Sequence, residues 1–230
     1  AFLYLLFPAS QIYFVSSIDA VITFLFFATF HYWHKLDKSR DWLKVSFLAF
    51  LSAFFTFGVV FLIPILLFED WRQHTAIKQS IRLGLILILS CAGFKILTGY
   101  DYYQSFWVAK SFEGTTGFYL FEKPKAYIFS RLADILELVY YLTPFLLILI
   151  YKGVKTIRPW KQLKTYSAVT GAAIISFLLF LAAGAYYTGE TARAANYIYP
   201  FLFIFIGTVI EKMKVGERQA VPLLRAIFAQ

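Results

Sequence analysis

Residues 42–68 read WLKVSFLAFLSAFFTFGVVFLIPILLF, an apolar stretch that Gly58 interrupts near its middle and Pro64 further on. Basic connections flank it, residues 31–44 before it and residues 69–82 after it. Basic loops of membrane proteins gather on the cytoplasmic side, and both connections can lie there only if the chain enters the bilayer and returns. We therefore predict a short broken helical hairpin, with arms of about 20 Å each. One long tilted helix is the alternative.

The composition of the chain indicates an integral membrane protein. Of its 230 residues, 60% are hydrophobic, 21% aromatic and 15% charged, whereas soluble domains average about 45–50% apolar and about 25% charged residues. Surface-to-volume scaling leaves too much of so apolar a chain exposed for one soluble domain, and the composition also excludes intrinsic disorder. The net charge of +9 comes mainly from basic residues between the apolar runs. We therefore interpret these residues as cytoplasmic loop charges and expect no nucleic-acid partner.

The predicted fold is an all-α polytopic transmembrane helical bundle, with about five full spans in addition to the hairpin. A helix needs about 20 apolar residues to cross a hydrocarbon core of about 30 Å. The runs that approach this length are residues 12–33, 81–99, 132–151, 165–187 and 196–211. Because the chain shows no internal repeats, we expect residues 1–230 to form a single transmembrane domain. The chain opens within an apolar stretch, and we expect further chain before Ala1.

Charged residues within or beside the spans are the candidate functional residues, because a charge at the centre of a bilayer costs about 2.5–3.5 kcal/mol or more. With the hairpin in place these residues gather toward the outer face, and they predict a polar pocket that opens there. They are Asp19, Lys95, Asp134, Glu137, Glu190 and Arg193. Structural interpretations stay open for each of them. Lys95 can extend to the interface, Asp134 can pair with Arg131, and Asp19 can accept hydrogen bonds from a neighbouring helix.

A long outer connection, residues 99–131, contains a predicted interfacial helix. Tyr103, Phe106, Trp107 and Lys110 follow the spacing i, i+3, i+4, i+7, which is typical of an amphipathic helix in the headgroup layer. Such a helix is either a membrane anchor or a lid over a lipid-linked substrate. The sequence signatures of soluble enzymes are missing from the chain. Its single cysteine excludes a cysteine-based metal site, and its three histidines are poorly spaced for metal ligation.

Several short motifs resemble the GT-C-type glycosyltransferases, which are large polytopic membrane proteins. The sequence GETAR at 189–193, followed by an aromatic span with YPF at 199–201, resembles segments late in such chains. Residues 48–64 are similar to the short paired helices that this superfamily places mid-chain, although Phe57 stands where the family often has a lysine. Pro8 followed by SIDA at 17–20 is also similar. The resemblance covers most of the chain and places it in the C-terminal part of such a protein.

The resemblance implies transfer of a sugar from a polyprenyl-phosphate donor to an acceptor hydroxyl at the outer leaflet. It implies Arg193 and Lys95 as ligands of the donor phosphate, Asp101 and Asp19 as candidate catalytic residues, and Glu190, Asp134, Glu137 and Tyr100 as residues of the pocket. A carboxylate would deprotonate the acceptor, and a divalent cation such as Mg²⁺ or Mn²⁺ would assist the departing phosphate. In the family the catalytic acid usually lies in the first outer loop, which we expect to precede Ala1, so that acid carries over to no residue of this chain.

Two other functions compete with an enzyme. A non-catalytic integral subunit of a larger membrane complex would account for the aromatic content and for the missing acid motif. A small transporter would also carry charges inside the membrane, but it should show related halves with breaks at matching positions, and only residues 42–68 show a break. Under each reading the expected location is a bacterial inner or plasma membrane, with membrane lipids as partners. Paired acids in an outer loop upstream of Ala1 would favour the enzyme.

Overall fold

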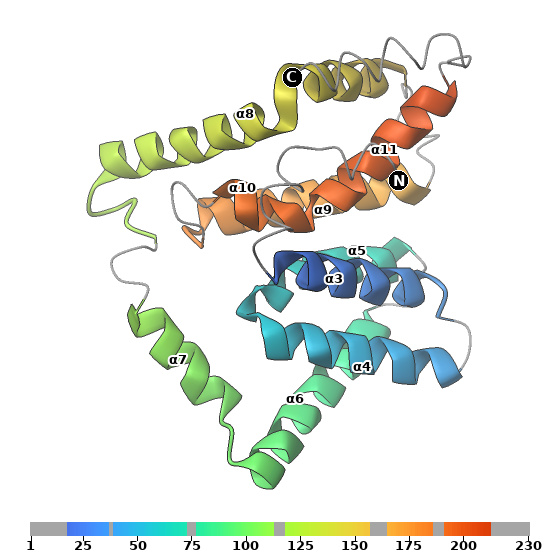
Figure 1. Ribbon diagram of the computed structural model, residues 1–230, viewed down its shortest axis with the longest axis vertical. Helices are drawn as coiled ribbons and strands as arrows, with labels where there is room; N and C mark the ends of the chain where they lie inside the picture. Colours follow the sequence, from blue (N-terminus) through green and yellow to red (C-terminus); the bar gives the residue numbers. More distant parts are fainter. Residues whose placement is uncertain are drawn as a thin grey trace. The chain divides into compact units, whose positions relative to one another are not determined.

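The computed structural model of the chain describes residues 18–36, 39–72, 77–112, 118–156, 165–185 and 191–212. Every element in these ranges is a helix, and none of them contains a β-strand, which confirms the all-α prediction (Figure 1). The chain divides into two compact units. The first unit comprises residues 1–20 and 118–230, and the second comprises residues 21–117. The prediction of a single domain stays a prediction.

The second unit contains a run of helices that follow one another through short connections. They are α3 (Asp19–His34), of which the first two residues belong to the first unit, α4 (Ser39–Phe55), the 3₁₀-helix η1 (Phe57–Phe61), α5 (Leu62–Arg72), α6 (Lys78–Thr98) and α7 (Tyr102–Phe112). Apolar side chains of α3, α4, η1 and α5 form its core, and Phe26 and Phe61 stack there at 6.4 Å between ring centroids.

The helix break expected near Gly58 lies one residue before Phe57. Thr56 has extended backbone angles (φ −155°, ψ 139°), and its Oγ1 accepts a hydrogen bond from the Gly58 backbone N–H at 2.9 Å. This local bond competes with the helical ladder, as threonine side chains commonly do at turns. The arms that leave the break are longer than predicted, each about 26 Å. They are longer because α4 already begins at Ser39 and α5 continues to Arg72, through residues more polar than the apolar stretch itself.

Both ends of the hairpin lie beside the last turn of α3. Trp42, at the start of α4, contacts the Trp33 ring edge-on at 5.9 Å between centroids. Glu69, in the last turn of α5, lies with its Oε1 2.6 Å from His34 Nδ1. Because Trp33 and His34 are neighbours in α3, the chain that leaves α3 through α4 returns to the same end through α5. We call this the polar end of the second unit.

Helix α6 starts at the polar end and leads away from it. The Arg82 guanidinium lies 4.5 Å from the centroid of the Trp42 ring, whereas Phe94, three turns later, contacts Phe54 near the end of α4. The helix ends at Gly99, whose φ of +77° is open to glycine without steric cost and whose N–H caps the Lys95 carbonyl at 2.8 Å. Among the described helices, α6 is the one long and apolar enough to cross a membrane, and little of it is buried.

Within the described residues, the first unit contains α8 (Pro124–Thr156), α9 (Thr165–Ala182), α10 (Thr191–Ala194), η3 (Ala195–Tyr197) and α11 (Tyr199–Lys212). Helix α11 packs against both α8 and α9, and α10 packs against α8. Thr170 of α9 donates a hydrogen bond to the Phe201 carbonyl of α11 at 2.8 Å. Helix α9 ends in a left-handed residue, Gly184 (φ +74°), and its closing bonds run from Ala185 N–H to the Phe180 carbonyl and from Gly184 N–H to the Leu181 carbonyl. These two bonds are those of a Schellman cap.

Candidate functional site

An ion pair between Asp19 and Arg193 joins residues far apart in the chain. Arg193 Nε donates to Asp19 Oδ2 at 2.7 Å. The carboxylate side chain is 4% exposed, whereas the arginine side chain is 44% exposed. A buried carboxylate that accepts a hydrogen bond from the guanidinium Nε restricts the orientation of that group. The sequence predicted a shared pocket for these two residues, and the structure brings them into direct contact.

Helix α10 is held against α8 by a second carboxylate. Glu137 Oε1 accepts a hydrogen bond from the backbone N–H of Ala192 at 3.0 Å. Thr191 and Ala192 are fully buried, so Glu137 fixes the backbone on which Arg193 stands. The spacing i, i+3 had placed Asp134 and Glu137 on one face of α8, and this face is the one turned toward the rest of the unit, since Asp134 is fully buried.

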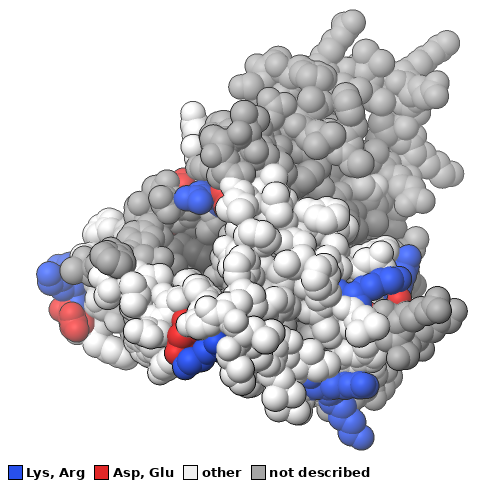
Figure 2. All heavy atoms as spheres, turned by 60° about the horizontal axis from the view of Figure 1, so that its bottom comes forward, with Lys and Arg blue, Asp and Glu red and all other residues white. Residues whose placement is uncertain are grey.

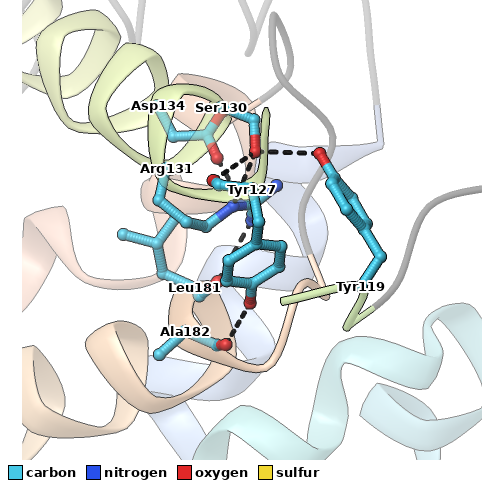
Figure 3. Close-up of polar contacts among 7 residues, drawn as sticks. All are labelled: Tyr119, Tyr127, Ser130, Arg131, Asp134, Leu181 and Ala182. Atoms are coloured by element: carbon cyan, nitrogen blue, oxygen red, sulfur yellow. Dashed lines mark hydrogen bonds and ion pairs between the residues drawn. The ribbon is translucent and has the colours of Figure 1, made fainter. Parts of the chain in front are cut away.

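One turn earlier in α8, a group of polar side chains binds the carboxyl end of α9 (Figure 3). Arg131 Nη1 donates to the Leu181 carbonyl at 3.0 Å and lies 3.1 Å from Asp134 Oδ2. The Tyr127 hydroxyl donates to the Ala182 carbonyl. Cationic groups stabilise helix carboxyl ends, where carbonyls lack partners within the helix. Asp134 thus pairs with Arg131, which is the structural role that the sequence left open for it.

These residues form what we call the carboxylate–arginine cluster: Asp19, Arg131, Asp134, Glu137 and Arg193. Three carboxylates and two guanidinium groups give it a formal charge of −1. Arg193 is the most exposed of the four side chains that form its ion pairs. A planar cation that is held rigidly from behind by a buried acid can bind an anion such as a phosphate. Glu190, which the sequence placed in the same pocket, lies outside the described residues.

The other candidate residues lie in the second unit. Lys95 Nζ lies 2.6 Å from Asp101 Oδ2, and Asp101 Oδ1 accepts the Gln104 backbone N–H at 3.1 Å, so Asp101 caps the start of α7. The hydrogen bond from Lys95, followed by the backbone bond from Gln104, holds the pKa of the Asp101 carboxyl below its ordinary value. A carboxylate with a lowered pKa is a weaker base. Tyr100 contacts the rings of Phe54 and Phe94.

Sequence reasoning missed the two acids at the polar end of the second unit. Glu69 and Asp70 are fully buried, although the sequence placed them in a solvated loop. Glu69 accepts from Arg72 Nε at 2.8 Å and from Arg72 Nη2 at 2.6 Å, besides its contact with His34. Asp70 Oδ2 accepts the backbone N–H and the hydroxyl of Ser80, both at 2.7 Å. The spacing of Glu69 and Arg72, three apart on one helix face, was the signal available for this pair.

Among the residues that the structure describes, no group of three or more histidine, cysteine, aspartate or glutamate side chains is arranged to hold a metal ion. The carboxylates of the cluster instead bind arginines and a backbone N–H. The chemistry that this arrangement can supply is recognition of an anion by Arg193, oriented by Asp19.

Comparison of the chain with protein-family models, with curated proteins and with solved structures gave no match.

Proposed function

We propose that the chain is a multi-pass helical membrane protein. Large apolar side chains are exposed along α4, α6, α8 and α9, among them Phe47, Leu89, Leu136 and Leu179. Water would penalise each of them by about 25 cal/mol per Å² of apolar surface, whereas hydrocarbon would not. On the face that Figure 2 shows, the charged side chains of the described residues form a few separate groups within an uncharged surface. Long exposed apolar surfaces of this kind are typical of lipid contact.

The dimensions of the second unit support a membrane placement. Lys78 and Thr98 are separated by about 30 Å along α6, which is the thickness of a hydrocarbon core. The polar end, with Glu69 and Arg82, lies near the start of α6, and aromatic rings around Phe94 lie near its end. Lipid-facing proteins place aromatic residues and charges at these two levels. In this placement the hairpin has two arms, one formed by α4 and the other by η1 together with α5. Each arm is long enough to approach the interface opposite the polar end.

Cysteine accessibility tests this placement. In a Cys91→Ala background, we expect Lys35→Cys and Lys78→Cys to react with a membrane-impermeant maleimide from one side of the membrane. Gln104→Cys should react from the other side, since α6 separates it from Lys78. All three side chains are exposed, so the substitutions leave the packing intact. Labelling of Lys35→Cys and Lys78→Cys from opposite sides would rule out the returning hairpin, and labelling of all three from one side would rule out α6 as a span.

Within this placement, we propose a glycosyltransferase-like function at the outer leaflet, in which Arg193 binds the phosphate of a polyprenyl-phosphate-linked sugar. The observation that carries the proposal is the Asp19–Arg193 pair, a half-exposed planar cation oriented by a buried carboxylate. Asp19 lies at the start of α3, the end opposite His34, and the sequence predicts that this end faces outward. The resemblance of residues 189–193 to GT-C-type chains supports the same assignment. In this function Asp19 is a positioning residue for Arg193.

The remaining candidate residues take secondary parts in this proposal. Glu137 holds the backbone of α10 in place through Ala192. Asp101, the candidate base, is held ionised by Lys95, and the same contact occupies the Lys95 cation.

Binding of a defined probe tests the proposal. The full chain in detergent is titrated with undecaprenyl phosphate and analysed by native mass spectrometry. We expect Arg193→Ala to lose about tenfold or more in affinity and Arg193→Lys to lose less, because lysine keeps the charge but not the planar donor geometry. Arg82→Ala is the matched control, since Arg82 lies at the polar end against Trp42. Equal binding by Arg193→Ala and by the unaltered chain would refute the role of Arg193.

A non-catalytic subunit is the second candidate, and one observation favours it. Asp19, Glu137 and Asp101 each bind a group of this same chain, which is the pattern of side chains that hold a structure together. In a subunit, the exposed apolar faces would contact other membrane proteins. Isolation of the chain from native membranes in a mild detergent separates the two functions. A stable complex with unchanged lipid-phosphate binding in Arg193→Ala would favour the subunit.

A further inference from the structure

We propose that α7 is a lipid-interface helix that binds the boundary between headgroups and acyl chains through the outer side of its aromatic residues. The sequence predicted an interfacial helix within residues 99–131. The inference rests on the membrane placement proposed above and adds which side of α7 contacts the phospholipid and which contacts fix its depth. Charged groups and exposed aromatic rings lie side by side here. The charged groups are unfavourable in hydrocarbon and the rings are unfavourable in water, and only the interface suits both.

The inner side of α7 packs on the tip of the hairpin. The Phe57 ring of η1 lies 5.1 Å from the Tyr102 ring and 5.3 Å from the Phe106 ring, measured between centroids. Burial there raises the pKa of the Tyr102 hydroxyl to about 12, so the group stays neutral. These contacts fix α7 beside the end of α6 and the turn of the hairpin. The helix therefore lies at the level at which α6 would leave the hydrocarbon core.

The outer side of α7 carries exposed aromatic and apolar side chains beside the exposed Gln104. Tyr103 is 71% exposed and Trp107 48% exposed, and their rings contact each other edge-on at 6.0 Å between centroids. Val108 is also exposed, as are Ile96 and Leu97 in the last turn of α6. Exposed apolar side chains of the proposed span thus continue onto α7, and the Lys95–Asp101 pair lies at the corner between the two helices.

That pair sets the depth. Lys95 and Asp101 form an exposed ion pair at the corner between α6 and α7, and Asp101 caps α7. A charged pair is unfavourable in hydrocarbon, so the start of α7 cannot lie inside the core. The exposed tryptophan and tyrosine are equally poorly placed in bulk water. Both conditions are met at the interface, where tyrosine and tryptophan combine an apolar ring with a polar group. The combination of an ion pair with exposed aromatic rings, and not hydrophobicity alone, therefore favours a lipid surface as the partner of α7.

Depth-dependent quenching tests this inference. A single-tryptophan chain keeps Trp107, with Trp33, Trp42, Trp71 and Trp160 changed to phenylalanine, and is reconstituted into vesicles whose lipids carry bromine either near the carbonyl end or near the methyl end of the acyl chain. We expect Trp107 to lose most of its emission with the shallow bromine and little with the deep one. A matched single-tryptophan chain with Ile88→Trp, exposed in the middle of α6, should show the reverse order.

The outcomes separate the two proposals. If Ile88→Trp is quenched by deep bromine while Trp107 is quenched by neither lipid, α7 does not bind the interface although the span stands. If neither position is quenched, the membrane placement itself fails. Should the loss of the buried Trp33 prevent folding, Tyr103→Cys in the Cys91→Ala background carries a spin label instead, since Tyr103 is exposed. The spin label should be partly accessible to both a water-soluble and an apolar relaxation agent. Full accessibility to the water-soluble agent alone would overturn the inference.

Discussion

The polar end of the second unit depends on Glu69. Replacing Glu69 with alanine should destabilise the chain more than replacing an exposed charged residue does. The Glu69 side chain is fully buried and makes three contacts of 2.6–2.8 Å with His34 and Arg72. Removing one member of a buried ion pair costs about 3–5 kcal/mol when the partner stays buried. His34 and Arg72 are 27% and 30% exposed and can be rehydrated in part. We therefore expect a loss of about 2–3 kcal/mol in the free energy of unfolding.

A graded series makes the test specific. Glu69→Gln keeps an oxygen acceptor and loses the charge, so it should cost about 1–2 kcal/mol. Lys44→Ala is the control, because it removes an exposed pair with Asp41 at 3.3 Å, and such pairs contribute about 1 kcal/mol or less. A double-mutant cycle of His34→Ala with Glu69→Ala should give a coupling energy of about 1 kcal/mol. The assay is reversible unfolding in mixed micelles of a mild and a denaturing detergent, followed by circular dichroism.

The result also bears on the path of the chain. His34 closes α3 and Glu69 closes α5, so a coupling between them requires both helix ends to lie together. If Glu69→Ala costs no more than Lys44→Ala, or if the cycle gives no coupling, the hairpin does not return to α3 and the polar end does not exist as described.

Three further predictions concern single contacts. Tyr127→Phe keeps the ring and loses the hydrogen bond to the Ala182 carbonyl, so it should lower the free energy of unfolding by about 1 kcal/mol in the same assay. Asp101→Asn retains a cap on α7 and loses the ion pair with Lys95. The pKa of Asp101 is lower in the folded chain than its ordinary value. The ion pair should therefore contribute fully to stability above the ordinary pKa, and this contribution should be lost as the pH falls through the lowered pKa of the folded chain. Unfolding measured at neutral and at acid pH should therefore show the wild-type advantage over Asp101→Asn disappearing in acid. The raised pKa of Tyr102, about 12, means that folding favours the neutral phenol. Ultraviolet titration should find that Tyr102→Phe removes a late phenol ionisation, and stability should decline as the pH rises above about 10, the phenol's ordinary pKa.

The candidate site was found in part from the sequence, because charges in apolar runs are conspicuous. Asp19 and Arg193 were selected independently as costly residues near the outer face, and they form an ion pair in the structure. Glu69 and Asp70 were passed over, because their position at the end of an apolar run made a solvated loop the simpler reading. Their burial depends on His34 and Ser80, which approach them only through the fold.

Local chemistry decided most of the helical architecture. The apolar runs predicted helices, Gly58 predicted a break, and the spacing of Tyr103 and Trp107 predicted α7, because each depends on residues within a few positions of one another. The return of the hairpin to the side on which it entered was inferred from loop charge, which indicates a side of the membrane and no contact. Only the tertiary structure decided that Glu69 binds His34 and that Asp19 binds Arg193. Contacts between residues distant in the chain depend on how whole helices pack, and no local pattern of residues specifies that packing.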